Sequence, residues 1–319
     1  MIREYTHKKF EKICSEKLQK AKKSFKAIVM DQDGTVKGEN DLKYKNSNLV
    51  ALLRKIVHRN KYPAIITGSG ASALKSFTSL VDFYRQKKYT NPTYIGIGNG
   101  VTLYKFDQKG RSELYNFTLT ISEVKSIVKV WKKVYTELKI QESDLQQKGL
   151  ITFRKFMETD WTGYIPKEYL SVFKQYNGQC FTEKIKVTVV FPAWDETRQR
   201  KLVGILQKNL DKILGKGLYF VSRGDDIFIH INHALKIDPK LFALQRIVTE
   251  LGLDKNQVIT FGDMPLDNDK GLLFDSRLPF TFTNRFFNKK DQQKPPFFLP
   301  GSLISPVGSV YNAIDYLLL

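Results

Sequence analysis

The feature that most constrains the fold is a series of short apolar segments, each of which ends in a polar turn. Four such segments occur, at residues 26–30, 64–67, 94–98 and 258–261. Helical periodicity is found between them, at residues 49–57, 73–84 and 239–251. Buried strands that alternate with helices are typical of a parallel sheet covered by helices. We therefore predict an α/β fold.

The alternation is interrupted in the middle of the chain. From about residue 113 the pattern changes to helices with two or three strands, which together make a small α+β unit. The first pattern resumes where Asp238-Pro239 begins a helix. We therefore predict a split α/β domain at residues 1–112 and 236–319, with a second unit inserted at 113–235.

Charge and cysteine content exclude several classes of protein. The chain of 319 residues carries 52 Lys and Arg against 32 Asp and Glu, a formal net charge of +20. This charge attracts polyanions, but it is spread along the chain, which is more typical of a solvated surface than of a nucleic-acid-binding patch. No apolar run approaches the ~18 residues of a transmembrane segment. Cys14 and Cys180 are too few for a disulfide framework, so we expect a reducing, cytoplasmic compartment.

Residues 1–25 show helical spacing of apolar residues among lysines, and they predict a basic amphipathic helix. Two roles are open for this helix. It packs on the domain that follows it, or it contacts a membrane or a partner. Neither its role nor the oligomeric state can be predicted from the sequence.

Polar side chains follow three of the predicted strands. Asp31 and Asp33 come after the first strand, Thr67 ends the second, and Asp263 and Asp267 follow the fourth. The carboxyl ends of parallel strands meet at one crevice, where four carboxylates would repel one another unless a cation shared them. Oxygen ligands without His or Cys favour Mg²⁺ over zinc or copper. The sequence therefore predicts a magnesium site.

A carboxylate beside such a cation can carry out phosphoryl transfer through an aspartyl-phosphate. The cation and a lysine neutralise the phosphoryl charge, while a hydroxyl and backbone N–H groups position it. A second carboxylate two residues further on can protonate the departing alkoxide and then accept a proton from water. Gly34 permits the tight turn that separates Asp31 from Asp33.

Four motifs resemble, in the same order, those of the haloacid dehalogenase (HAD) superfamily. Asp31-Gln-Asp-Gly-Thr-Val36 resembles D-x-D-G-T-[LV], and Ile65-Ile-Thr-Gly68 resembles the second motif. Lys240-Leu-Phe-Ala-Leu244 with Leu251-Gly252 resembles the third motif of the Cof-type and sucrose-phosphatase-like branch. Gly262-Asp-Met-Pro-Leu-Asp267 matches the fourth, G-D-x-x-x-D. The resemblance implies a Rossmann-like, HAD-like core with an α/β cap inserted between the second and third motifs.

The resemblance also implies a role for each acidic residue in these motifs. Asp31 would be the nucleophile and a Mg²⁺ ligand, and Asp33 the general acid and base, with its backbone carbonyl on the metal. Asp263 would ligate the metal, and Asp267 would ligate or support it. Asp269 has two open interpretations, as a support for the site or as a solvated loop acid.

Phosphate binding would fall to Thr67, Gly68 and Lys240 according to the resemblance. Lys236 lies nearby and competes with Lys240, although the spacing of Lys240 to Asp263 fits the motif better. Ser69 stands where the second motif commonly has Arg, which removes an arginine contact to substrate.

The implied activity is Mg²⁺-dependent hydrolysis of a small phosphorylated metabolite, with a sugar phosphate as the expected substrate. Two alternatives remain: a phosphomutase or phosphotransferase that uses the same site, and a non-enzymatic basic protein that binds nucleic acid or an anionic surface. Residues of the insertion that could contact a substrate, or be merely structural, are Arg154, Trp161, Tyr164, Trp194, Arg223 and His230.

Overall fold

The computed structural model describes residues 15–38, 46–86, 89–158, 165–176, 178–224, 227–235, 237–264, 267–274, 278–281, 297–298 and 306–319. By its internal contacts the chain divides into two compact units, which are described separately. The first unit comprises Met1–Thr67, Ala73–Tyr115 and Lys240–Leu319, and the inserted unit comprises Gly68–Ser72 and Asn116–Pro239. None of the helices in the described part of the chain has the length and apolar character that crossing a membrane requires.

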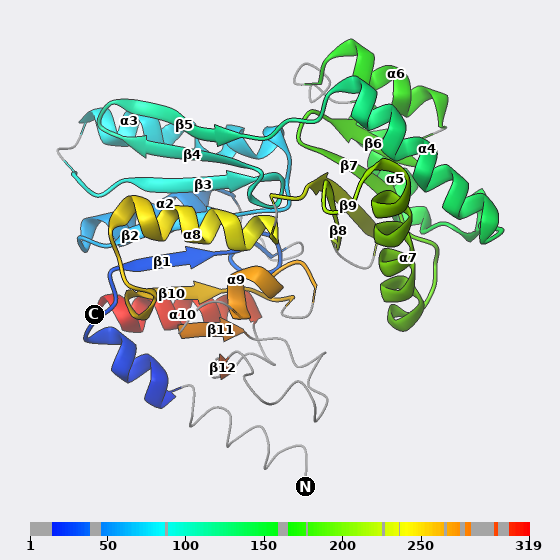
Figure 1. The fold of residues 1–319 in the computed structure, drawn as a ribbon. Helices are drawn as coiled ribbons and strands as arrows, with labels where there is room; N and C mark the ends of the chain where they lie inside the picture. Colours follow the sequence, from blue (N-terminus) through cyan, green and yellow to red (C-terminus); the bar gives the residue numbers. More distant parts are fainter. Residues whose placement is uncertain are drawn as a thin grey trace, which may run out of the picture. The chain divides into compact units, whose positions relative to one another are not determined.

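The first unit is built on one eight-stranded sheet in the order β12-β11-β10-β1-β2-β3-β4-β5 (Figure 1). The strands that run parallel are β1 (Ala27–Met30), β2 (Tyr62–Ile66), β3 (Thr93–Ile97), β10 (Val258–Phe261), β11 (Leu278–Thr281) and β12 (Phe297–Phe298). β4 (Thr102–Asp107) runs antiparallel to β3 and is followed by β5 (Gly110–Asn116). The prediction of an α/β fold is confirmed.

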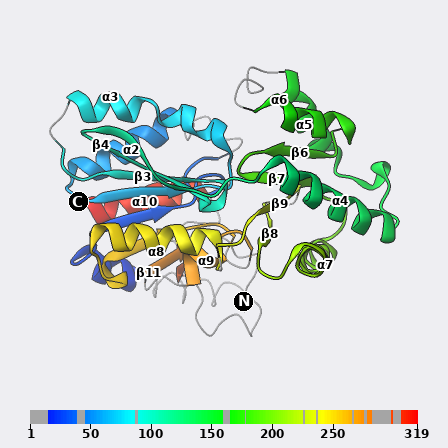
Figure 2. The ribbon, with the colours of Figure 1, turned by 45° about the horizontal axis from the view of Figure 1, so that its top comes forward.

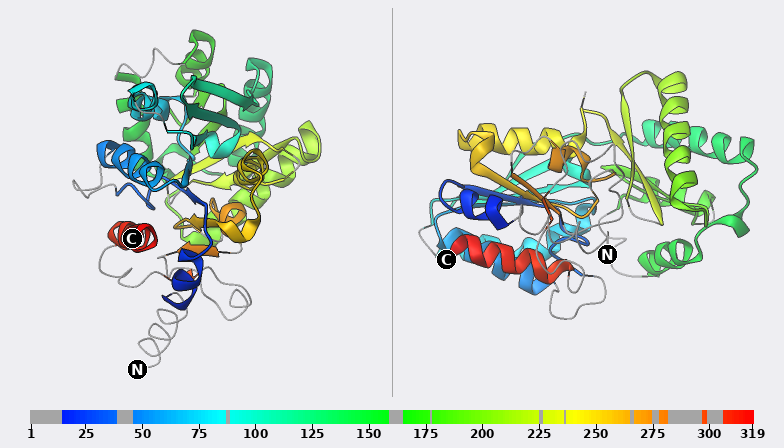
Figure 3. Two further views of the ribbon diagram at one scale, coloured as in Figure 1. Left: turned by 90° about the vertical axis from the view of Figure 1, so that its left-hand side faces the viewer. Right: turned by 90° about the horizontal axis from the view of Figure 1, so that it is seen from below.

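Helices cover both faces of this sheet, with α8 on one face and α2 and α10 on the other (Figures 1 and 3). The helices are α2 (Asn46–His58), α3 (Ser79–Gln86), α8 (Pro239–Leu251), α9 (Lys270–Phe274) and α10 (Pro306–Leu318). Short 3-10 turns lie at Ala71–Phe77, Gly98–Gly100 and Lys255–Gln257. α8 packs Ala243, Leu244 and Ile247 against Val29 and Ala64 of the sheet, as its apolar spacing predicts. Its burial holds the start of the helix, and hence Lys240, against the sheet.

Only part of the predicted N-terminal helix can be assessed, because residues 1–14 lie outside the described residues. Residues 15–22 are helical, and Leu18 and Ala21 of this helix are buried. Their burial favours the interpretation in which the helix packs on the domain behind it.

The inserted unit has its own antiparallel sheet in the order β6-β7-β9-β8 (Figure 2). Its elements are α4 (Ile121–Glu137), a 3-10 turn (Glu142–Asp144), α5 (Gln147–Glu158), α6 (Lys167–Gln175), β6 (Cys180–Glu183), β7 (Lys186–Val190), α7 (Glu196–Leu214), β8 (Tyr219–Arg223) and β9 (Phe228–His233). α4 starts at a capping box formed by Thr120 and Glu123. Alternate residues of the two central strands, including Val187 and Ile229, join the helices in one hydrophobic core.

Strand β1 determines where the functional residues meet. It lies between β10 and β2 in parallel, and Met30 is paired with Phe261 on one side and with Ile65 on the other. The three strands therefore end at the same edge of the sheet. Asp31 leaves this edge directly after β1, and Thr67 and Asp263 follow the neighbouring strands.

Candidate active site

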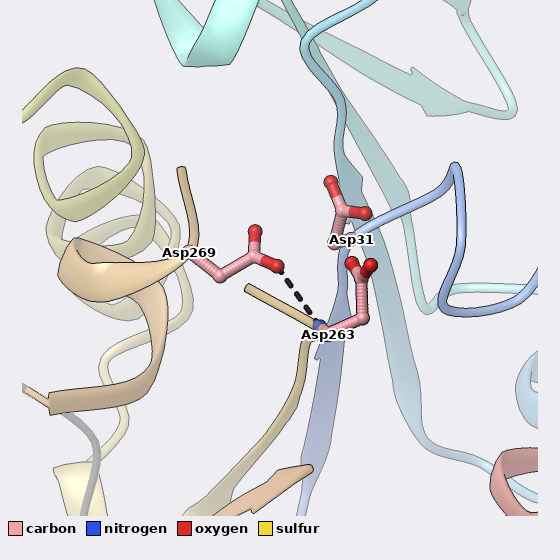
Figure 4. Close-up of side chains that lie close together, drawn as sticks. All are labelled: Asp31, Asp263 and Asp269. Atoms are coloured by element: carbon pink, nitrogen blue, oxygen red, sulfur yellow. Dashed lines mark hydrogen bonds between the residues drawn. The ribbon is translucent and has the colours of Figure 1, made fainter. Parts of the chain in front are cut away.

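Three carboxylates gather at the carboxyl ends of β1 and β10. They belong to Asp31, Asp263 and Asp269, and one oxygen of each lies within 4.8 Å of the others (Figure 4). Asp31 and Asp269 are buried and Asp263 is partly buried. The sequence predicted the first two members of this cluster. It left the role of Asp269 open.

Lys240 is a buried counter-charge for this cluster. It lies in the first turn of α8, and its Nζ donates to Oδ1 of Asp31 and to Oδ1 of Asp269, each at 2.6 Å. Burial opposes the charge of the ammonium group, but Asp269 and Asp31 outweigh that effect and raise the pKa of Lys240 above its ordinary value. Lys240 therefore stays charged and orients one oxygen of Asp31.

Asp269 also fixes the loop that carries Asp263. Its Oδ2 accepts hydrogen bonds from the backbone N–H groups of Asp263 and Met264, both at 2.9 Å. One carboxylate thus positions Lys240 with one oxygen and the loop with the other. Asp267 is absent from the cluster found among the described residues, and its assignment as a metal ligand stays a prediction.

Thr35 connects the two acidic strand ends, a role that the sequence did not reveal. Its Oγ1 lies 3.3 Å from Oδ2 of Asp31 and 3.2 Å from Oδ1 of Asp263. A hydroxyl group has one proton to donate, so the two carboxylates share it. Thr35 holds them close together despite their repulsion.

The Asp33 carboxylate is held apart from this cluster. It accepts a hydrogen bond from Nζ of Lys37 at 3.1 Å and one from Oγ1 of Thr67 at 3.4 Å. Its side chain is 46% exposed, whereas Asp31 is almost fully buried. The turn that follows Asp33 is closed by a hydrogen bond from the Gly34 N–H to the Lys37 carbonyl, at 2.9 Å. The two acids of the first motif therefore occupy different environments: Asp31 is buried, and Asp33 is in contact with solvent.

The remaining candidates are divided between described and undescribed parts of the chain. Lys236, Trp161 and Tyr164 lie outside the described residues. Arg223 is ion-paired with Glu196 at 3.1 Å, and Nδ1 of His230 lies 3.2 Å from the Thr188 hydroxyl. Trp194 packs at the edge of the hydrophobic core, and Arg154 is exposed. These contacts favour the structural interpretation for Arg223, His230 and Trp194.

The acidic cluster fits a divalent cation. Burial, followed by the charge of Asp269, raises the pKa of Asp31 to about 7, although Lys240 opposes this shift. Burial and the charges of Asp269 and Asp31 raise the pKa of Asp263 well above its usual range. Carboxylates in this state are stabilised by a hard cation with oxygen ligands, and Mg²⁺ is such a cation. Asp31 and Asp263 would hold it.

We expect the stability of the metal-free protein to fall as the pH rises. The unfolded chain releases the Asp31 proton near pH 3.8, but the folded chain retains it up to about pH 7. The unfolded state binds fewer protons between these values, so the free energy of unfolding decreases across that window, by ~2–4 kcal/mol. Urea unfolding in EDTA at pH 5 and pH 8 measures this. An equal stability at both pH values, or the same slope in an Asp31→Asn variant, contradicts the assignment.

Gly34 is expected to tolerate no side chain. Its φ of +83° is in the left-handed region, and a Cβ atom would lie 2.5 Å from Oδ2 of Asp263. We expect Gly34→Ala to destabilise the protein by ~2 kcal/mol or more and to lower turnover, because Asp263 must move. Gly217→Ala is the matched control, since Gly217 has a φ of +72° and no atom within 4 Å of such a Cβ. Equal turnover of a phosphate ester by the two variants would show that the reaction does not depend on the position of Asp263.

Residues 28–284 match the family of haloacid dehalogenase-like hydrolases. No curated protein matches the chain. Many solved structures share its fold, and three of them, at low sequence identity, are described next.

The first is the IMP-bound IMP-nucleotidase of Plasmodium falciparum (13% identity, TM-score 0.54, covering 94% of this chain and 70% of that chain). The second is SMU.1108c from Streptococcus mutans UA159 (13%, TM-score 0.59, 93% and 100%). The third is BT1666 from Bacteroides thetaiotaomicron, described among phosphatases of the haloalkanoate (HAD) superfamily (14%, TM-score 0.55, 93% and 96%). The family match covers most of the chain and includes the strands that carry Asp31 and Asp263. This chain belongs to the haloacid dehalogenase-like hydrolases.

Proposed function

We propose that the chain is a Mg²⁺-dependent phosphatase that hydrolyses a small phosphorylated metabolite through an aspartyl-phosphate on Asp31. The observation that carries the proposal is the buried Asp31 carboxylate, which Lys240 orients at 2.6 Å beside Asp263. A carboxylate that is desolvated, charge-compensated and fixed in direction is suited to act as a nucleophile. The catalytic core would be residues 1–112 and 236–319, and the cap 113–235.

In the first step, one oxygen of Asp31 attacks the phosphorus atom of the ester. The bond from phosphorus to the leaving oxygen breaks, and the alkoxide takes a proton from Asp33. Asp33 suits this role because its side chain lies outside the buried cluster of Asp31, Asp263 and Asp269 and is 46% exposed. A departing group and water can therefore reach it. The products are the alcohol and phosphorylated Asp31.

In the second step, Asp33 removes a proton from a water molecule that attacks the same phosphorus atom. The bond from phosphorus to the Asp31 oxygen breaks, which releases inorganic phosphate and restores the Asp31 carboxylate. Throughout, Lys240 and the hydroxyl of Thr67, with the N–H of Gly68, hold the phosphoryl oxygens. Asp31 and Asp263 would hold Mg²⁺, which when bound would supply positive charge to balance these carboxylates and the phosphoryl group.

The substrate class is proposed as a sugar phosphate. A nucleoside monophosphate is the first alternative, because a nucleotidase that binds IMP shares the fold. A binding function for nucleic acid would not need a buried acidic cluster, so the cluster disfavours that alternative.

A panel of sugar phosphates, nucleoside monophosphates and 4-nitrophenyl phosphate, assayed with Mg²⁺ and with EDTA, tests the proposal. We expect release of inorganic phosphate that depends on Mg²⁺. A phosphomutase or phosphotransferase would instead convert the substrate to an isomer or transfer the phosphoryl group to an added alcohol. The absence of any Mg²⁺-dependent phosphate release from the whole panel would contradict hydrolysis.

A further inference from the structure

The five residues that follow Thr67 belong to the inserted unit, although the chain on both sides belongs to the first unit. This segment is Gly68–Ser72, between Thr67 and Ala73. Thr67 itself is fixed by β3 and the turn after it, because its N–H donates to the Gly96 carbonyl at 2.9 Å and its carbonyl accepts from the Asn99 N–H at 2.8 Å. The chain thus passes to the other unit directly after a proposed phosphate ligand.

Two charged side chains of the hairpin formed by β6 and β7 hold this segment. Nζ of Lys186 donates to the Gly68 carbonyl at 2.7 Å. The Glu183 carboxylate lies against Gly70, where an added Cβ would meet both of its oxygens at 2.1 Å. Glu183 and Lys186 are paired in register across the hairpin, with their charged atoms 3.8 Å apart.

Both side chains are buried, which is costly for charged groups unless they gain strong hydrogen bonds. Lys184 in the same turn is exposed, so burial of a charged side chain in this hairpin is particular to Lys186 and its partner Glu183. The buried charge of Lys186 is directed at a backbone carbonyl, and a hydrogen bond from an ammonium group is stronger than one from a neutral donor. Lys186 therefore fixes the Gly68 carbonyl.

A fixed carbonyl also fixes the next N–H group. A trans peptide unit is planar, so the N–H of Ser69 points opposite to the carbonyl of Gly68. The fixed Gly68 carbonyl and the restrained Thr67 together set the direction of the backbone N–H groups of Gly68 and Ser69, which follow Thr67 in the chain. Donors that are oriented before the reaction stabilise phosphoryl charge better than donors that must reorient.

We propose that Lys186 is a positioning residue for phosphate binding, acting through the peptide between Gly68 and Ser69. The inference rests on the proposed function, because it needs a phosphoryl group bound at Thr67 and Gly68. It adds a residue of the inserted unit, outside all four sequence motifs, to those on which the reaction depends.

The test compares Lys186→Met with Lys184→Met, which removes the same charge from an exposed position of the same turn, and with Lys186→Arg. Affinity for inorganic phosphate in Mg²⁺ is measured by calorimetry, and kcat and KM with 4-nitrophenyl phosphate. We expect Lys186→Met to weaken phosphate binding by about 10-fold and to lower kcat/KM by at least as much. Lys186→Arg should recover part of both, and Lys184→Met should resemble the wild type.

A purely structural role would lower the folded fraction, seen by circular dichroism, without changing the affinity of the folded molecules for phosphate. Phosphate binding by Lys186→Met within about two-fold of Lys184→Met would overturn the inference, even if the wild type hydrolyses phosphate esters. If the wild type hydrolyses none, the proposed function fails, and the calorimetric comparison still decides the role of Lys186. A wild type that neither hydrolyses phosphate esters nor binds inorganic phosphate would overturn both.

Discussion

Replacement of Asp31 by Asn will lower the turnover of a phosphate ester by ~10⁴-fold or more, because the amide cannot attack phosphorus. The fold will persist. Asn has nearly the shape of Asp, and the change removes a carboxylate whose pKa burial and Asp269 raise to about 7. We therefore expect the metal-free variant to be at least as stable as the wild type at pH 8. Steady-state kinetics with Mg²⁺ and urea unfolding in EDTA measure the two effects.

Asp315→Asn is the control for this change. Asp315 lies in α10 and forms an exposed ion pair with Lys55, so its replacement removes one carboxylate without touching the site. Its turnover should equal that of the wild type. Activity of Asp31→Asn within ten-fold of this control would refute Asp31 as the nucleophile.

Replacement of Lys240 by Met will both destabilise the protein and abolish most of its activity. In the wild type, Lys240 contacts Asp31 and Asp269 at 2.6 Å each. Its replacement leaves these two buried carboxylates without the cation between them. Removal of one member of a buried ion pair costs ~3–5 kcal/mol. We expect a loss of this order in the free energy of unfolding at pH 8, smaller at pH 5 because protonation relieves the repulsion.

Lys55→Met provides the matched control, since Lys55 and Asp315 are 2.7 Å apart on the surface. An exposed pair contributes no more than ~1 kcal/mol, so this variant should unfold like the wild type. If the Lys240→Met protein retains turnover, another cation binds the phosphate. Lys236 would then be the next residue to replace.

The parts of the site that the sequence predicts are those attached directly to strand ends. Asp31, Thr67 and Asp263 follow buried apolar segments, and parallel pairing must bring such ends together. Periodicity predicted the helix that begins at Asp238-Pro239, whereas the choice of Lys240 over Lys236 came from the resemblance to the third motif.

Asp269 could not be placed in this way. Whether the carboxylate at 267 or that at 269 reaches Lys240 depends on the backbone path of the loop after β10, and two acids in one loop offer the same chemistry. The contact of Asp269 with the N–H groups of Asp263 and Met264 exists only once that path is formed. Lys186 was missed for a related reason, because its partner is a backbone carbonyl far away in the sequence.

The sequence interpretation also overlooked the strands β4 and β5, which extend the sheet beyond β3. The outermost strand, β5, is mostly polar and exposed, and β4 is buried only in part, so neither has the continuous buried apolar run of the central strands. The turn at Gly110, which has a φ of +102°, was the available signal for a hairpin.

The two places where the chain passes between the units affect how the substrate range of such a protein can change in evolution. Thr67 is the last residue before the chain first leaves the first unit, and Lys240 is the first after it returns for good. A lineage could exchange the segment Asn116–Pro239 and keep Asp31, Asp33 and Lys240. Because the proposed phosphate contacts, Thr67 and Lys240, flank the insertion, we expect its exchange to change the reaction rate together with the substrate range.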